Sequence, residues 1–137
     1  MELQFAFLAE SATVPPDRKF YVLGGGFSAV ALASFPARIG FAAVSGWRVT
    51  GSDAGQRHEL EARFVDSAGG LVVPKVPMLF QFPPEAPPPE REVIVPAVTF
   101  FSPMISEKGG YQVQYWFGGT QVGSVGLYID EQPAVTT

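Results

Sequence analysis

The sequence contains no cysteine, and this absence excludes several kinds of chemistry at once. Without thiols the chain has no disulfide, no thiolate nucleophile and no sulfur ligand for a metal ion. A zinc or iron site would have to be built on carboxylates and on His58, the single histidine. We therefore expect no metal site and no cofactor.

Basic residues are also few. Nine lysines and arginines stand against thirteen aspartates and glutamates, which gives a formal net charge of −4 at pH 7. The longest basic run is Arg18-Lys19, whereas a protein that binds nucleic acid needs a basic stripe to replace the counterions of the phosphates. The charge pattern predicts that nucleic acid is not a partner.

Long apolar runs are missing as well. No segment approaches the roughly 20 consecutive apolar residues that a membrane-spanning helix requires. The opening residues, MELQFAFLAESA, lack the basic start and the long apolar core of a secretory signal, because Glu2 and Gln4 interrupt the run. We expect a protein made without a cleaved leader, with no membrane partner and a cytoplasmic location.

Apolar residues are nevertheless abundant, at 47% of the chain against 16% charged residues, which is the composition of a folded domain. At 137 residues the chain fits a single domain over residues 1–137. Short apolar runs alternate with turns rich in glycine and proline, and helical periodicity is almost absent. We predict an all-β fold, a single antiparallel β-sandwich of the immunoglobulin-like or jelly-roll-like kind with about eight or nine strands.

Two segments show strand periodicity most clearly. Residues 57–65 place apolar side chains on one face and charged side chains on the other, the pattern of a half-buried strand. Residues 111–129 alternate on both sides of Gly118-Gly119, a pair suited to a tight hairpin turn. Residues 2–9 are the expected first strand, with one face made by Leu3, Phe5 and Phe7.

Three consecutive glycines, Gly24-Gly25-Gly26, follow a short apolar run, where a phosphate-binding loop would begin. Such a loop needs further spaced residues and a helix whose amino terminus faces the phosphate, but residues 27–30 alternate into another strand. We interpret the glycines as a bulge or turn where strands pass closely. Alanine at Gly25 is expected to lower stability if that residue has a positive φ.

No combination of side chains predicts catalysis. His58 would need an orienting carboxylate and a nucleophile, and its neighbour Glu59 lies on the opposite face of the strand. Glu59 and Glu61 share a face some 7 Å apart, a spacing open to a glycosidase or to weak calcium binding. A solvated face neutralised by Arg63 explains them more simply. We predict no catalytic residue and a protein that is not an enzyme.

The segment PPEAPPPE, residues 83–90, is a stiff proline-rich loop with apolar side chains on both sides of it. Phe100 and Phe101 are adjacent, so a strand sends their rings to opposite faces and leaves one ring exposed unless the loop or a partner covers it. Trp116 shares a face with glutamines and is a further candidate contact. The predicted interaction residues are Phe80, Phe82, Phe100, Phe101, Met104 and Trp116.

The favoured function is a non-catalytic interaction or structural module that binds a protein partner or copies of itself. The alternative is a sandwich that binds carbohydrate or another small ligand on an aromatic shelf at Trp116 or near Trp47. A hydrolase that works with carboxylates is the least favoured of the three. A flat apolar patch would support the first function, and a pocket with convergent acidic groups would support the last.

The chain also combines three longer segments, namely FAFLAESATV…DRKFYVLGGGF, RHELEARFVDSAG and GGYQVQYWFGGTQVGSVGLYI. Together they resemble an uncharacterised bacterial domain family, common in actinobacteria, with a Lys-Leu-Tyr-x-x-Gly-Gly-Gly-Trp-like motif and a late Gly-x-Tyr hairpin. This chain has Phe20 in place of the usual leucine and Phe27 in place of the usual tryptophan, and both changes keep the position apolar. The resemblance implies a single compact β domain and brings no activity with it.

Overall fold

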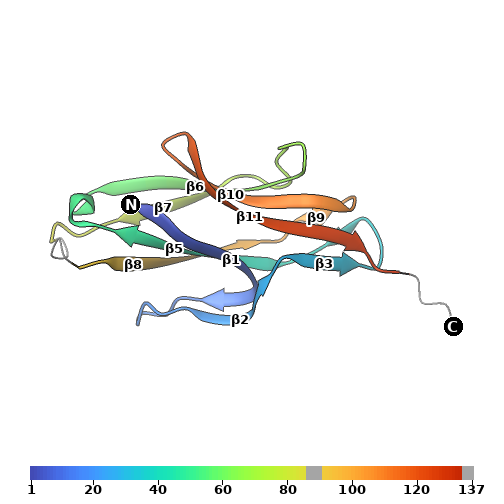
Figure 1. Ribbon diagram of the computed structural model, residues 1–137, viewed down its shortest axis with the longest axis horizontal. Helices are drawn as coiled ribbons and strands as arrows, with labels where there is room; N and C mark the ends of the chain where they lie inside the picture. The colour runs from blue at the N-terminus through green and yellow to red at the C-terminus, as the bar shows by residue number, and fades with distance from the viewer. Residues whose placement is uncertain (86–90, 134–137) are drawn as a thin grey trace.

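The computed structural model describes residues 1–85 and 91–133, and there the chain is all-β, as predicted (Figure 1). Eleven strands lie in the described residues, more than the eight or nine expected, because short pairings such as β4 and β9 leave no periodic pattern. The same residues contain one 3-10 turn, η1 (Gly51–Asp53). The strands are β1 (Glu2–Thr13), β2 (Tyr21–Phe27), β3 (Ala29–Leu32), β4 (Ala37–Arg38), β5 (Phe41–Val49), β6 (Arg57–Val65), β7 (Val76–Gln81), β8 (Val93–Phe101), β9 (Met104–Ile105), β10 (Gly109–Phe117) and β11 (Thr120–Glu131).

The strands form two main sheets, with the orders β2-β1-β5-β8 and β3-β11-β10-β6-β7, and the small pair β4-β9. All neighbours are antiparallel except β3, which lies parallel to β11, so the prediction of a purely antiparallel fold is wrong. The cause is a crossover. The chain leaves β2 in the first sheet and enters β3 in the second with only Ser28 between them.

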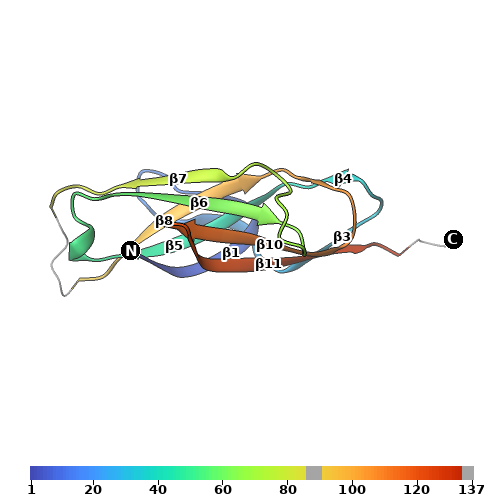
Figure 2. The same cartoon turned by 90° about the horizontal axis from the view of Figure 1, so that it is seen from above.

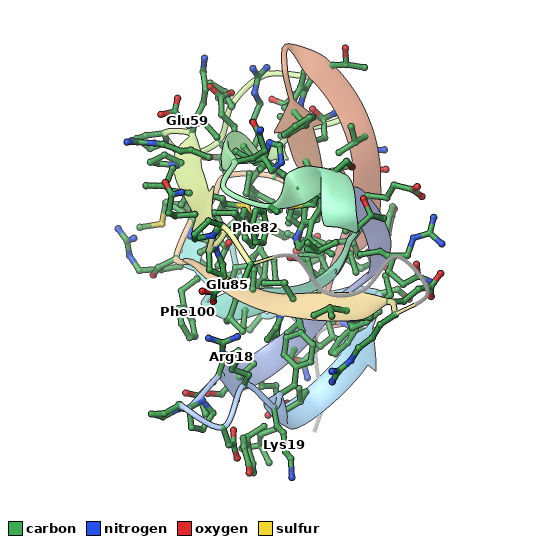
Figure 3. The ribbon with its side chains drawn as sticks, turned by 90° about the vertical axis from the view of Figure 1, so that its left-hand side faces the viewer. Arg18, Lys19, Glu59, Phe82, Glu85 and Phe100 are labelled. Atoms are coloured by element: carbon green, nitrogen blue, oxygen red, sulfur yellow. The ribbon has the colours of Figure 1, made fainter. Side chains whose placement is uncertain are left out.

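The two sheets pack face to face and enclose the core (Figures 2 and 3). Trp47 of β5 lies between them, with its ring centroid 5.7 Å from that of Tyr115 and 6.0 Å from that of Phe80. On one side, the closed side, the chain crosses from β2 to β3 and β1 lies against β11. On the other side, the open side, β7 and β8 are the outermost strands of their sheets. The result is a half-closed barrel.

The first strand carries a bulge that the sequence did not reveal. Pairing with β5 shifts register between Leu3 and Phe5, so the prediction that Leu3, Phe5 and Phe7 share a face is wrong. Leu3 packs against the core, whereas the Phe5 and Phe7 rings stack with centroids 6.2 Å apart on the outside of the sheet. One extra residue in a strand sends every following side chain to the other face.

The three glycines form the bulge that was predicted, within an edge strand. Gly25 pairs with Ala9 and Phe27 pairs with Leu8, which leaves Gly26 as the extra residue of β2. The positive φ values belong to Gly24 (63°) and Gly26 (91°). Gly25 has no positive φ, so the condition set for a loss of stability on its substitution by alanine is met by its two neighbours instead. The next element is a strand, and no helix amino terminus from the described residues faces this turn.

The two clearest periodic segments behave as predicted. On β6, Leu60, Ala62 and Phe64 are buried, and the charged side chains between them face outward. Strands β10 and β11 form the expected hairpin, with Gly118 and Gly119 at φ of 58° and 79° in the turn. Across the described part of the chain, no helix has the length and apolar character needed to cross a membrane.

Candidate interaction site

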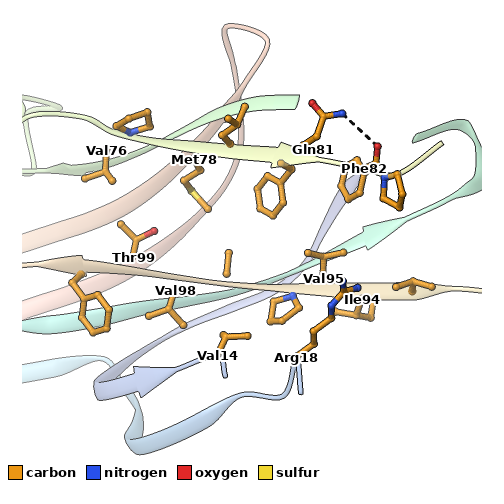
Figure 4. A pocket seen from close by; sticks show the side chains of 18 residues that line it. Val14, Arg18, Val76, Met78, Gln81, Phe82, Ile94, Val95, Val98 and Thr99 are labelled. Atoms are coloured by element: carbon orange, nitrogen blue, oxygen red, sulfur yellow. Dashed lines mark hydrogen bonds between the residues drawn. The ribbon is translucent and has the colours of Figure 1, made fainter. Parts of the chain in front are cut away.

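A groove runs along the open side, between the facing edges of β7 and β8 (Figure 4). Its volume is about 650 Å³. The inner wall consists of alternate side chains from the two strands, because successive residues of a strand point to opposite faces. These side chains are Met78, Phe80 and Phe82 of β7 and its end, and Val95, Ala97 and Thr99 of β8.

The core is incomplete at this groove. Val95 and Ala97 pair with Trp47 and Ser45, which are 1% and 0% exposed, yet Val95 and Ala97 themselves are only half-buried. Burial therefore falls off within a single step from β5 to β8. The physical reason is that β8 is the outermost strand of its sheet in the described part of the chain, and the inward side chains of β8 are covered only in part.

The backbone along both edges is also without strand partners among the described residues. The Phe82 amide donates to the Gln56 carbonyl at 3.0 Å, so alternation turns the backbone groups of Leu79 and Gln81 toward the groove. Pro77, in the same alternating series, has no N–H. On β8, Pro96 pairs with Gly46, and a proline in a sheet turns its nitrogen to the free edge.

The predicted interaction residues do not form one cluster. Phe101 (4% exposed) belongs to the core, and Phe80 (9%) is the buried floor of the groove. Phe100 is 63% exposed on the opposite face from Phe101, as the alternation predicted. Phe82 is half-buried at the start of the groove, and Met104, 46% exposed, lies beyond the far end of β8.

Trp116 lies elsewhere, on the outer face of the five-stranded sheet. Its indole is half-buried, and the Arg63 guanidinium carbon lies 4.1 Å from the ring centroid. The indole N–H donates to Gln114 Oε1 at 3.0 Å, and Arg63 is held by Glu61 at 2.8 Å. The ring is thus covered by a paired cation, which occupies the face that a stacked ligand would need.

Sequence reasoning missed Arg18, which lines the groove from the turn between β1 and β2. The side chain extends toward β8 near Val95, as Figure 4 shows. Its backbone has a φ of 62°, and its amide donates to the Pro15 carbonyl at 2.9 Å. In the sequence the only signal is the short Arg18-Lys19 run. Figure 3 shows Arg18, Phe82, Glu85 and Phe100 along the same side of the molecule.

A second polar cluster, also missed, surrounds Asp53, which is 3% exposed. The Asp53 carboxylate contacts the Met1 amino group at 3.1 Å and His58 Nε2 at 2.9 Å, and accepts the Thr50 amide at 2.8 Å. Burial raises the pKa of Asp53, but hydrogen bonds from Thr50, the amino terminus and His58 outweigh it, so the pKa is lowered. His58 is therefore held in a structural contact.

No metal-binding group is built in the described ranges, where no three or more His, Asp or Glu side chains converge. Glu59 and Glu61 are engaged by arginines, with Arg57 3.3 Å from Glu59 and Arg63 2.8 Å from Glu61. This is the solvated, neutralised face that the sequence favoured over an acidic pair. The open-side groove is the strongest candidate site because it combines volume, half-buried apolar side chains and free strand edges.

Comparison with known proteins adds a family but no chemistry. A model of DUF6941, a family of unknown function, matches residues 4–130. No curated protein matches. Among solved structures, the chain is similar to the Pseudomonas fluorescens alkylpurine DNA glycosylase AlkC bound to DNA containing an abasic site analog, at 13% identity and a TM-score of 0.37. The alignment covers 91% of this chain and 30% of the glycosylase chain, and a likeness this weak carries no argument.

Proposed function

Because the chain belongs to DUF6941, a family of unknown function, no activity follows from membership, and we propose that it is a non-catalytic interaction module. It binds another protein chain, a partner or a second copy, through its open side. One observation carries the proposal. The inward side chains Val95 and Ala97 are half-buried beside fully buried partners, so a binding partner gains apolar burial there.

Exposed apolar side chains extend the surface beyond the groove. Phe100 is 63% exposed and Leu79 is 56% exposed, and both lie on the edge strands that border the groove. Large apolar side chains gathered beside an open groove are typical of protein-binding surfaces. The proline-rich loop joins these two strands, and the part of it at residues 86–90 lies outside the described residues.

The test compares two exposed apolar residues on opposite sides of the barrel. Phe100→Ser is expected to abolish self-association in light scattering, or retention of a host partner in a pull-down, because it removes an apolar contact from the open side. Leu23, 69% exposed on β2, is the matched control, and Leu23→Ser is expected to leave association unchanged. Both variants should keep the wild-type melting temperature, because the Phe100 ring and the Leu23 side chain both lie outside the core.

Equal loss of association in both variants, or a wild-type protein that stays monomeric and recovers no partner, would contradict the proposal. Phe101→Ser does not serve as the test, because the Phe101 ring packs on Phe41 with centroids 5.6 Å apart and its loss would unfold the core.

We class the paired sheets with β-sandwiches of the immunoglobulin-like or jelly-roll-like kind, in one domain over residues 1–137. We also propose a bacterial, mainly actinobacterial, family with the Lys-Leu-Tyr-x-x-Gly-Gly-Gly-Trp-like motif, a cytoplasmic location, and no nucleic-acid or membrane partner. The packed faces and the scattered basic residues support the first and the last of these. The others rest on sequence resemblance and composition.

A further inference from the structure

The sheet order leaves a place for one more strand on the open side, beside both β7 and β8. Packed sheets lie about 10 Å apart, and paired strands lie about 4.8 Å apart, so one extended chain between two facing sheet edges is one ladder spacing from each. Both edges present backbone groups, from Leu79 and Gln81 on β7 and from the Pro96 series on β8. The half-buried side chains of β8 present the apolar wall that such a strand would cover.

Among the described residues, the groove is lined by one charged side chain. Arg18 is the one charged residue that lines it among the described residues, and its guanidinium forms no ion pair there. The other lining residues are apolar side chains with Gln81 and Thr99. The complementary ligand is therefore an extended chain with apolar side chains at every second position and a carboxylate near Arg18.

A second copy of this protein is a poor donor of that strand. Each described strand is already paired within a sheet, so a copy would have to unpair one of its own. The segment PPEAPPPE has five prolines in eight residues and lacks the donors that a ladder needs. These features favour a donor from a different protein.

We propose that an extended segment of a different protein, carrying an acidic residue, binds between β7 and β8 as an added strand and closes the barrel. This inference rests on the proposed function and adds the chemical character of the partner segment. Strand addition takes its affinity from main-chain hydrogen bonds and its specificity from alternate side chains. Here the apolar wall of the groove contacts every second side chain of the added strand, and Arg18 pairs with its carboxylate.

The experiment selects binders from a displayed library of nine-residue peptides with apolar residues at alternate positions and either glutamate or lysine at the last position. The wild-type protein is expected to enrich glutamate peptides at least tenfold over lysine peptides. Arg18→Glu should reverse that preference, and Arg18→Asn, which tolerates the positive φ, should remove it. Thermal melts establish that both variants fold.

Amide hydrogen exchange then distinguishes strand addition from other binding. A bound glutamate peptide is expected to slow amide exchange at Leu79, Gln81 and Val98 at least tenfold. The same peptide with N-methylated backbone amides should give no protection. Binding without protection of these amides, or without a charge preference, overturns the added strand. If no peptide is selected while the Phe100-dependent association persists, the strand proposal fails and the interaction module stands. Pairing of two copies through the β8 edges would also overturn it.

Discussion

The closed and open sides of the barrel are built from similar apolar residues, yet they are buried to very different degrees. On the closed side Leu8 of β1 and Ile129 of β11 are both fully buried. On the open side Val95 is half-buried and Phe100 is 63% exposed. The difference lies in the neighbours. On the closed side β1 lies against β11 and only Ser28 separates β2 from β3, whereas on the open side β7 and β8 are the outermost strands of their sheets. A strand's position in the sheet order, more than its composition, decides how deeply its apolar face is buried.

The largest expected effect comes from removing side chains on the two sides of the barrel. Leu8→Ala should lower the free energy of unfolding by about 3 kcal/mol, because it leaves a cavity in a fully packed site. Val95→Ala should cost only about 1 kcal/mol, because its side chain keeps part of its contact with water in the folded state. Urea denaturation measures both. Equal losses would mean that the open side is as well packed as the closed side.

The buried contacts of Asp53 are expected to contribute to the free energy of unfolding. Asp53→Asn is expected to cost about 2 kcal/mol, because it removes a buried charge that contacts the amino terminus and His58. The folded-state pKa of Asp53 lies below its ordinary value, so its contribution is complete above the unfolded pKa of about 4 and is lost as pH falls through the folded pKa. Wild-type stability measured between pH 6 and 2 should fall more steeply than that of the variant. Parallel curves would show that Asp53 contributes nothing to acid sensitivity.

Two glycines, Gly26 and Gly126, differ in backbone conformation and allow a comparison of backbone strain. Gly26, in the bulge of β2, has a φ of 91°, so Gly26→Ala should cost about 1 kcal/mol. Gly126 on β11 has open space where a Cβ would lie and no positive φ, so Gly126→Ala is the control and should be neutral or slightly stabilising. Chemical denaturation of the two variants decides the matter. A neutral Gly26→Ala would mean that the bulge relaxes without cost.

The smallest expected effect is a gain. Tyr115 is fully buried, and burial raises the pKa of its hydroxyl to about 12. The Ser45 hydroxyl lies near enough to lower that pKa in part, but the two groups do not meet in hydrogen-bond geometry. The Tyr115 hydroxyl oxygen has no hydrogen-bond partner in the described structure. Tyr115→Phe removes this unsatisfied group and should raise stability by up to about 1 kcal/mol in a thermal melt. Destabilisation would reveal a partner for the hydroxyl, such as an ordered water.

The sequence predicted strands wherever one face is buried and the other is wet. Residues of β6 and of the β10–β11 hairpin alternate accordingly, and the opposite orientations of Phe100 and Phe101 follow from the same rule. The rule assigned the wrong faces to the side chains of β1, although it predicted the strand. The bulge at residues 3–5 arises from pairing with β5, and no local sequence pattern records it. Strand β5 is buried on both faces, so its residues carry no alternation at all.

The candidate site was predicted only in part, for a related reason. Apolar character marked the segment from Phe80 to Met104, but a sequence pattern does not say which strand is outermost in its sheet. Phe80 and Phe101 therefore joined the exposed candidates although they lie inside, and Arg18 was missed because the turn that brings it to β8 is a tertiary contact. Sheet order was the missing information.

The parallel pairing of β3 with β11 has a consequence for the order of folding. Ala29 pairs with Tyr128 and Leu32 with Glu131, so the contact that closes the barrel joins segments from opposite ends of the domain. Closing so long a loop costs entropy before any contact is made, and chains rich in distant pairings fold slowly, within milliseconds to seconds. During synthesis β3 must wait, unpaired, until the last strand has left the ribosome. In that interval the backbone groups that β3 later pairs with β11 have no strand partner within the described fold.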